Sequence, residues 1–356
     1  MDPFSQAALG AVVGQATGHA RLGYRAAAVG ALAGALPDID VLFAVGGDYF
    51  DQLVMHRGIT HSLVFVPLAG PLLGAAAWWL ERRYGRPNEL QGASRQRLGS
   101  WILVTTLALL SHPLLDYLTP YGTQLLLPFS DARFAVNAMP IIDPVYTLLL
   151  AGGLLLAGRW WRARARRVAV ATLAVSCAYL AYGEVLNNAA EREAVRQLEA
   201  AGISGARVSA FPTILQLHYR RVVARSDGHD RVGFLSLWRT CPIEWSRAPR
   251  LPEPAPAVQS FLASREGRIF HWFTMGWARY RLEQLTDGLR LHATDLRYGF
   301  TADPDRSIFN ARVAVAEDGR LAGPVLAGRD ARDATGQRLA LLFRDTYAPE
   351  CAVGTP

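Results

Sequence analysis

Four short stretches in the first half of the chain place an acid or an imidazole at the edge of an apolar run. They are residues 37–40 (PDID), 56–62 (HRGITHS), 112–116 (HPLLD) and 142–144 (IDP). Carboxylates and imidazoles beside hydrocarbon are energetically expensive, so we interpret them as functional. Their oxygen and nitrogen atoms suit a divalent metal, with zinc as the first choice and manganese as the alternative.

The spacing within two of these stretches supports a metal site. His112 and Asp116 are four residues apart, so on a helix they share one face. Asp38 and Asp40 follow Pro37, which is expected to end or bend a helix. In an extended segment these two carboxylates would point to opposite sides, and one could bind metal while the other orients a histidine. Solvated loop acids are the alternative interpretation.

The stretch 56–62 is the densest group. We predict that His56 and His61 bind metal, and that Ser62 or Thr60 caps the helix that follows. Arg57 has a planar guanidinium suited to a phosphate or carboxylate, although a simple contact with a lipid headgroup is the alternative. We also predict catalytic roles for Asp143, which could orient a water molecule, and for Arg133, as a second anion contact.

Apolar runs predict six membrane helices in the first half, and most are near the ~20 residues that cross a bilayer. The first two are rich in Gly and Ala, which predicts either a tightly packed hairpin or a re-entrant pair. The expected helices span residues 5–19, 24–37, 62–80, 100–118, 143–159 and 168–186.

Arginine placement orients these helices. Twelve arginines follow the first, third and fifth helices, whereas only Arg57 and Arg133 follow the second and fourth. Positive loops face the cytoplasm, so the part after the sixth helix is predicted to be periplasmic or extracellular. All the predicted metal residues, and Asp143, then lie on the outer side.

The second half is predicted to be a β-rich soluble domain. We divide the chain into a transmembrane domain, 1–186, and an extracytoplasmic domain, 187–356, that begins with an amphipathic helix at 187–201. Short alternating runs predict strands, including 207–211, 213–224 and 268–273, and Asp227-Gly228 predicts a turn. Cys241 and Cys351 could pair if this half is extracytoplasmic.

Composition narrows the partners. The chain has 356 residues, 51% of them hydrophobic, and a formal net charge of +7. The arginines lie between apolar runs, which does not favour nucleic-acid binding. We therefore expect the lipid bilayer, and a lipid or lipid-linked molecule, as the partners.

Several motifs resemble the bacterial membrane-bound metal-dependent hydrolase family, which is related to the LexA-regulated inner-membrane hydrolases. They are MDPFSQAALGAVVGQA, ALAGALPDIDVL, HRGITHSLVF, HPLLDYLTPYGTQLLLPFSDARF and IIDPVYTLLL. The resemblance implies metal binding by Asp38, Asp40, His56, His61, His112 and Asp116. In some relatives a His stands in place of Gln6, and many long-branch members carry Glu in place of Gln15. A later segment, FPTILQLHYRRVVARSDGHDRVGFLSLW, resembles the extracytoplasmic tail of one long branch.

Our leading hypothesis is a membrane hydrolase that acts on a lipid or lipid-linked phosphoester near the outer leaflet, and peptide or acyl-ester hydrolysis remains open. A non-enzymatic metal-binding scaffold that recruits an envelope partner is the alternative. A transporter is a third interpretation, disfavoured because the acids cluster at one face.

Overall fold

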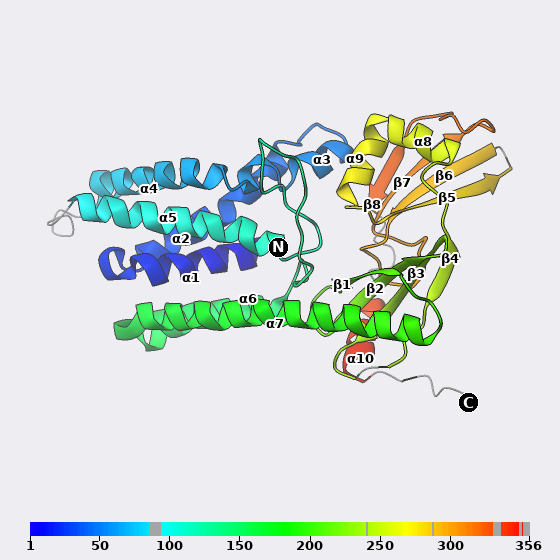
Figure 1. Ribbon diagram of the computed structural model, residues 1–356. Coiled ribbons are helices and arrows are strands. Elements are labelled where there is room, and N and C mark those ends of the chain that lie inside the picture. Colours follow the sequence, from blue (N-terminus) through cyan, green and yellow to red (C-terminus); the bar gives the residue numbers. More distant parts are fainter. Residues whose placement is uncertain (86–93, 240, 287, 330–335, 349–350, 352–356) are drawn as a thin grey trace. The chain divides into compact units, whose positions relative to one another are not determined.

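The computed structural model describes residues 1–85, 94–239, 241–286, 288–329, 336–348 and 351. The chain forms two compact units (Figure 1). The helical unit comprises Met1–Gly46 and Met55–Tyr182, and the β-rich unit comprises Gly47–Val54 and Gly183–Pro356.

The helical unit begins with a close helical pair, α1 (Pro3–Leu22) and α2 (Arg25–Ala35). Their backbones touch at glycines, because a Cβ atom on Gly10 would lie 2.3 Å from the Gly30 carbonyl oxygen. A Cβ atom on Gly14 would lie 2.1 Å from the Ala26 carbonyl oxygen. Small residues are what allow such an approach. The tight packing predicted from the Gly/Ala composition is therefore confirmed.

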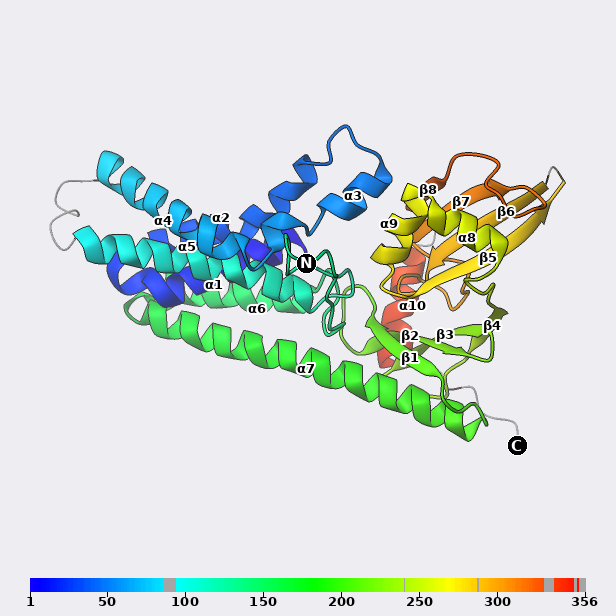
Figure 2. The same cartoon turned by 45° about the horizontal axis from the view of Figure 1, so that its top comes forward.

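α5 (Ser94–Tyr117) is the central helix of this unit and packs against α1, α2 and α4 (Phe65–Tyr84) (Figures 1 and 2). α6 (Pro144–Leu155) packs against α1. Shorter segments join these helices: η1 (Leu36–Leu42), α3 (Tyr49–Met55), η2 (Ile59–His61), the π-helical η4 (Leu156–Trp160) and η5 (Arg162–Arg164).

The six predicted membrane helices are not confirmed. Among the described residues, two helices are long and apolar enough to cross a membrane, Arg95–Tyr117 and Arg162–Ala200. A third span results if the bent pair Tyr49–His61 and Phe65–Tyr84 counts as one. α2 has 11 residues and α6 has 12, and at ~1.5 Å per residue both are shorter than the ~30 Å hydrocarbon layer.

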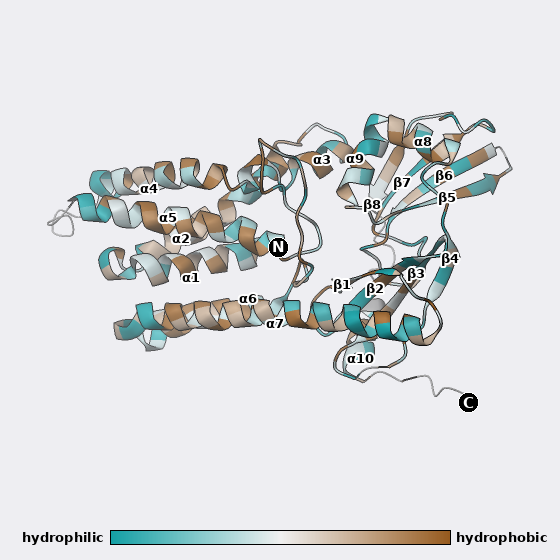
Figure 3. Cartoon of the chain, viewed as in Figure 1, coloured by the Kyte–Doolittle hydropathy of each residue, from teal (hydrophilic) through white to brown (hydrophobic). Residues whose placement is uncertain are grey.

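α7 (Ala165–Ala200) is one continuous helix, so the amphipathic segment expected at 187–201 is its C-terminal part rather than a separate helix. Figure 3 shows hydrophobic residues along its middle and hydrophilic residues near both ends. From Gly183 onward the helix belongs to the β-rich unit.

The β-rich unit contains two antiparallel four-stranded sheets in its described residues, with strand orders β1-β2-β3-β4 and β5-β6-β7-β8. Asp227 and Gly228 have positive φ and join β2 to β3, as the sequence predicted. The strands are β1 (Arg207–Pro212), β2 (Tyr219–Ser226), β3 (His229–Ser236), β4 (Ser246–Pro249), β5 (Ala278–Leu285), β6 (Gly288–Asp295), β7 (Phe309–Val315) and β8 (Leu326–Arg329).

The strand predicted at 268–273 is wrong, because this segment lies in helix α9 (Arg265–Phe273). Ser264 caps the helix by accepting a hydrogen bond from the Gly267 amide. Phe270 and Phe273, three residues apart, are both buried, which is a helical spacing. The strand predicted at 213–224 begins only at Tyr219. Two further helices were not predicted, α8 (Pro256–Ala263) and α10 (Gly336–Tyr347).

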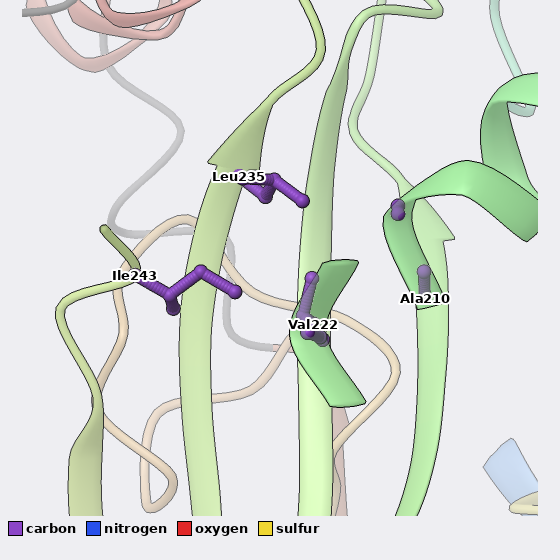
Figure 4. Packing of buried hydrophobic residues seen from close by; sticks show 6 residues of the cluster. Ala210, Val222, Leu235 and Ile243 are labelled. Atoms are coloured by element: carbon purple, nitrogen blue, oxygen red, sulfur yellow. The ribbon is translucent and has the colours of Figure 1, made fainter. Parts of the chain in front are cut away.

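The end of α7 packs onto the first sheet. Ala190 and Ala194 of the helix share a buried cluster with Ala210, Val222 and Leu235 of the strands, and with Ile243 (Figure 4). Cys241 and Cys351 form a disulfide with their Cα atoms 5.2 Å apart, which confirms the pairing raised from the sequence.

Candidate metal centre

His112 and Asp116 lie on the last turns of α5, and neither side chain is exposed to solvent. The i, i+4 spacing brings them together as predicted, with His112 Nε2 3.6 Å from Asp116 Oδ2. The central position of α5 in the helical unit explains why both polar side chains are buried.

Asp38 and Asp40 lie in the short 3-10 helix η1 rather than in an extended segment. Pro37 is at its start, where a missing amide proton costs nothing, so the chain turns immediately after α2. The two carboxylates still have different neighbours. Asp38 lies against the Nε2 atoms of His61 and His112, whereas Asp40 lies against the Nδ1 atoms of His56 and His61.

His61 ends the 3-10 segment η2 and is fully buried. The next residue, Ser62, accepts a hydrogen bond at its hydroxyl from the Phe65 amide at the start of α4. The N-cap position of α4 is Val64, so the prediction that Ser62 or Thr60 is the cap is wrong, although Ser62 still bonds the first amide of the helix. This hydrogen bond fixes the chain direction at the helix, and thereby positions the imidazole beside it.

Four side-chain atoms converge in what we call the four-ligand cluster: Asp38 Oδ1, His61 Nε2, His112 Nε2 and Asp116 Oδ2. The two histidine nitrogens are 3.0 Å apart. Their distances to the two carboxylate oxygens are 3.3–3.6 Å. A tetrahedral metal with bonds of ~2.0–2.1 Å separates its ligand atoms by ~3.3 Å. The spacing of the cluster therefore fits a metal ion of zinc size.

The outer nitrogen of each histidine in the cluster faces an acceptor. His112 Nδ1 lies 2.6 Å from the Gly34 carbonyl oxygen, and His61 Nδ1 lies 3.1 Å from Asp40 Oδ2. With the proton on Nδ1 in both rings, the two Nε2 atoms would direct lone pairs into the cluster, which is the tautomer that metal binding requires. A metal ion, or a proton shared between the two nitrogens, would then relieve the repulsion of lone pairs 3.0 Å apart.

The buried carboxylate of Asp116 supports the same assignment. Its Oδ2 atom has no hydrogen-bond partner of acceptable geometry in the described part of the chain. Arg57 Nε lies 3.0 Å from this oxygen as an ion-pair partner, and a metal ion would supply the directional contact that the oxygen lacks. The residues present therefore fit a divalent metal with two nitrogen and two oxygen ligands.

Asp40 is held by several donors in addition to the histidines. Its Oδ2 atom accepts from the Arg57 amide at 2.8 Å and from the Thr60 hydroxyl at 3.3 Å. Burial alone would raise the pKa of this carboxyl, but hydrogen bonds with His56 and His61 hold that pKa below its usual value. A charged Asp40 is suited to orient imidazoles.

A second group shares Asp38 with the first. Asp38, Asp40 and His56 also offer ligand atoms within 4.8 Å of one another. His56 Nδ1 lies 3.0 Å from Asp40 Oδ1, and its side chain is 29% exposed, unlike the fully buried His61 and His112. All six predicted metal residues thus lie in one neighbourhood, and His56 is at its accessible edge.

The three predicted catalytic residues have different surroundings. Arg57 is buried, with Nε 3.0 Å from Asp116 Oδ2 and a terminal nitrogen 2.6 Å from the Thr119 hydroxyl. Arg133 donates to the Tyr121 and Gly122 carbonyl oxygens.

Asp143 caps α6 at the Tyr146 amide and accepts from the Tyr179 hydroxyl. Of these three residues, Arg57 forms an ion pair with a member of the four-ligand cluster, Asp116, and the catalytic roles of all three stay predictions.

The structure adds residues that the sequence analysis did not assign to the site, Gln6 and Gly34 among them. Gln6 is buried and donates from Nε2 to Asp116 Oδ1 at 3.0 Å. Gly34 provides the carbonyl that fixes His112. The histidine that some relatives carry in place of Gln6 could have indicated its role from the sequence. The Gly34 contact is made by a backbone carbonyl, which no residue type indicates. Gln15 is also buried but belongs to neither metal-binding group.

Comparisons with known proteins agree with the membrane character of the helical unit. The family model described as YdjM inner membrane protein matches residues 1–190. The chain is also similar to inner membrane protein YbcI of Escherichia coli (strain K12), with 33% identity over 153 residues that cover 36% of this chain and 79% of YbcI. The comparison with solved structures found no match. These matches confirm the family resemblance, and the chain belongs to the YdjM inner membrane protein family.

Proposed function

We propose that this protein is a membrane-embedded, metal-dependent hydrolase that acts on a lipid or lipid-linked phosphoester near the outer leaflet. The observation that carries the proposal is the convergence of two imidazole lone pairs and two carboxylate oxygens in the four-ligand cluster. Zinc fits this donor set best, with manganese as the alternative. A bound divalent ion would supply Lewis acidity and an activated water.

The protein's own residues would position that ion and the substrate. Asp40 and the Gly34 carbonyl orient the two imidazoles. Arg57 holds Asp116 and adds positive charge where an anion would develop. The partly exposed edge at His56 and Asp38 gives the approach to the centre, since their side chains are 29% and 18% exposed. A membrane-edge site with an arginine favours an anionic lipid ester.

The proposed orientation places the metal centre and the β-rich unit outside the cytoplasm. The asymmetry of arginines between alternate loops supports it. The disulfide between Cys241 and Cys351 is a separate support, because disulfides persist mainly in oxidising compartments. A reporter fused after residue 200 should behave as periplasmic, and cytoplasmic reporter activity would overturn this orientation.

A metal-binding scaffold is the second candidate, and one observation favours it. Four protein ligands already fill a tetrahedron, which is typical of structural zinc sites, whereas catalytic sites keep one position open. The behaviour of Asp38 distinguishes the hydrolase from the scaffold, because Asp38 is the most exposed member of the cluster and belongs to both candidate metal groups. If a water molecule replaces Asp38 as a ligand, the metal has the open position that a catalytic site requires.

The test is metal analysis of the detergent-purified full chain, followed by a screen of lipid phosphoesters. We expect stoichiometric zinc or manganese and metal-dependent turnover. Arg57→Lys should keep the metal but lower turnover, because lysine keeps the charge and loses the planar fork. Full turnover by this variant would reduce Arg57 to a headgroup contact. Stoichiometric metal without hydrolysis of any phosphoester, acyl ester or peptide would favour the scaffold.

A further inference from the structure

A row of basic side chains crosses the second sheet of the β-rich unit. Arg281 of β5 pairs in register with His292 of β6, and His292 pairs with Arg312 of β7. Directly paired residues point to the same face of a sheet, so the three side chains are neighbours. The opposite face carries apolar residues such as Leu291 and Val313, which are buried. The basic row is therefore on the polar face.

This arrangement is unfavourable unless something neutralises it. Like charges placed opposite each other destabilise a sheet. Glu283 is already engaged, since it accepts from His292 at 2.7 Å and its other oxygen lies 3.8 Å from a terminal nitrogen of Arg281. Asp305 is shared, because its Oδ1 atom lies 2.9 Å from Arg279 Nε and 3.4 Å from Arg281 Nε.

Two guanidinium groups on this face have spare hydrogen-bonding capacity. Arg281 Nε is buried and has no hydrogen bond of acceptable geometry in the described residues. Arg312 has no ion-pair partner within the described part of the chain. After pairing with Glu283 and Asp305, the polar face of the sheet therefore keeps a net positive charge and unused hydrogen-bond donors.

The same residues line a polar cavity of about 230 Å³. Thr294 and Asn310 lie two positions along from His292 and Arg312, so they share the polar face and add uncharged hydrogen-bonding groups. Arg306 contributes a further basic side chain from the segment before β7. Drug-sized ligands need ~300–1,000 Å³, so this cavity suits a single small charged group.

We propose that this cavity, which we call the arginine pocket, binds a phosphate group. Its lining includes the basic side chains of Arg281, His292, Arg306 and Arg312, and one acid, Asp305, which is paired with Arg279 and Arg281. Guanidinium groups bind phosphate oxygens through paired charge-assisted hydrogen bonds. Arg281 and Arg312, one on each side of His292, are placed to form such bonds with one phosphate group. The site is separate from the four-ligand cluster and does not depend on the hydrolase proposal.

The test uses the full chain in nanodiscs of phosphatidylcholine, titrated with inorganic phosphate by calorimetry at constant ionic strength. We expect the double variant R281Q/R312Q to bind phosphate about tenfold or more weakly, because it removes both forks. The matched control is Arg320→Gln, since this arginine is 86% exposed and outside the pocket. Its affinity should equal that of the unmodified protein.

Equal phosphate affinity in R281Q/R312Q and the unmodified protein would overturn the proposal, as would an equal loss in Arg320→Gln. The single variant Arg312→Gln controls for a folding defect in the double variant, because Arg312 is exposed and its replacement should not disturb the fold. It should also weaken phosphate binding. Nanodiscs of phosphatidylglycerol identify the source of the phosphate. If phosphatidylglycerol weakens the binding of inorganic phosphate to the unmodified protein but not to the double variant, the ligand is a lipid headgroup. If phosphate binds equally well in both kinds of nanodisc, the ligand is soluble.

Discussion

Two buried groups of ionisable side chains in the helical unit differ in how their hydrogen bonds are completed. Glu81 of α4 accepts from Trp101 Nε1 at 2.8 Å and from Arg97 Nε at 3.2 Å through one oxygen. Its other oxygen accepts from Arg25 and Arg97. Every acceptor in the Glu81 group therefore faces a donor.

The four-ligand cluster has the opposite balance. His61 and His112 place their Nδ1 atoms against the acceptors of Asp40 and Gly34, and place their Nε2 atoms inward, 3.0 Å apart. Asp116 Oδ2 has no hydrogen-bond partner of acceptable geometry in the described residues, although Arg57 lies 3.0 Å away. A buried polar group that serves structure completes its own hydrogen bonds, whereas a ligand site leaves acceptors facing one another. The comparison indicates which of the two clusters could bind a cation.

The largest expected effect is that of His112→Ala. Removing this imidazole takes away one of two nitrogen ligands, so the protein should lose its bound metal. Metal content per chain, measured by mass spectrometry after purification, checks this. Glu81→Gln is the control from the other cluster and should keep full metal. If His112→Ala retains stoichiometric metal, the proposed centre is wrong.

Asp40→Asn should have an intermediate effect. Asparagine keeps the shape but removes the charge that orients His61, and loss of such a partner typically lowers metal affinity by about 10–100-fold. Competition with a chelator of known affinity measures the change. A complete loss equal to that of His112→Ala would instead indicate that Asp40 is itself a ligand, through the group with Asp38 and His56.

The sequence predicted the side chains of the centre but not its backbone support. The spacing of His112 and Asp116 was sufficient because both lie on one helix turn. His61 and Asp38 come from separate segments, and the sequence predicted only that both lie on the outer side, which does not require them to converge. The Gly34 carbonyl could not be predicted, because it depends on the close packing of α1 and α2 and on their contact with α5.

The fold shows a similar limit. Strands such as β7 alternate between buried and more exposed residues in a way that one sequence reveals, whereas 268–273 has aromatic residues common to strands and helices. The hydrogen bond from the Gly267 amide to Ser264 caps this segment as a helix. Apolar composition also suggested more membrane spans than the structure supports, since α2 has only 11 residues and the helical segment Pro144–Trp160, although close to its predicted bounds, is shorter than a full span.

Gln6→Leu should have a smaller effect on the metal than Asp40→Asn. It removes the hydrogen bond from Gln6 Nε2 to Asp116 Oδ1, which restrains a ligand without supplying one. Because such a bond contributes net ~1 kcal/mol, metal affinity should fall by about tenfold or less. The same chelator competition measures it. Complete loss of metal in this variant would indicate that the glutamine is itself a ligand.

Glu81→Gln should have the smallest effect, and on stability alone. The amide keeps the shape of the side chain but removes the charge that Arg97 and Trp101 hold in a buried position. Arg25 is 48% exposed, so water screens its part of the interaction. We expect a loss of about 1–2 kcal/mol in the free energy of unfolding, measured by denaturation in detergent. Metal affinity should not change, because the Glu81 group already pairs its acceptors with donors. A parallel fall in metal affinity would show that the two clusters are energetically coupled, and the distinction drawn between them would fail.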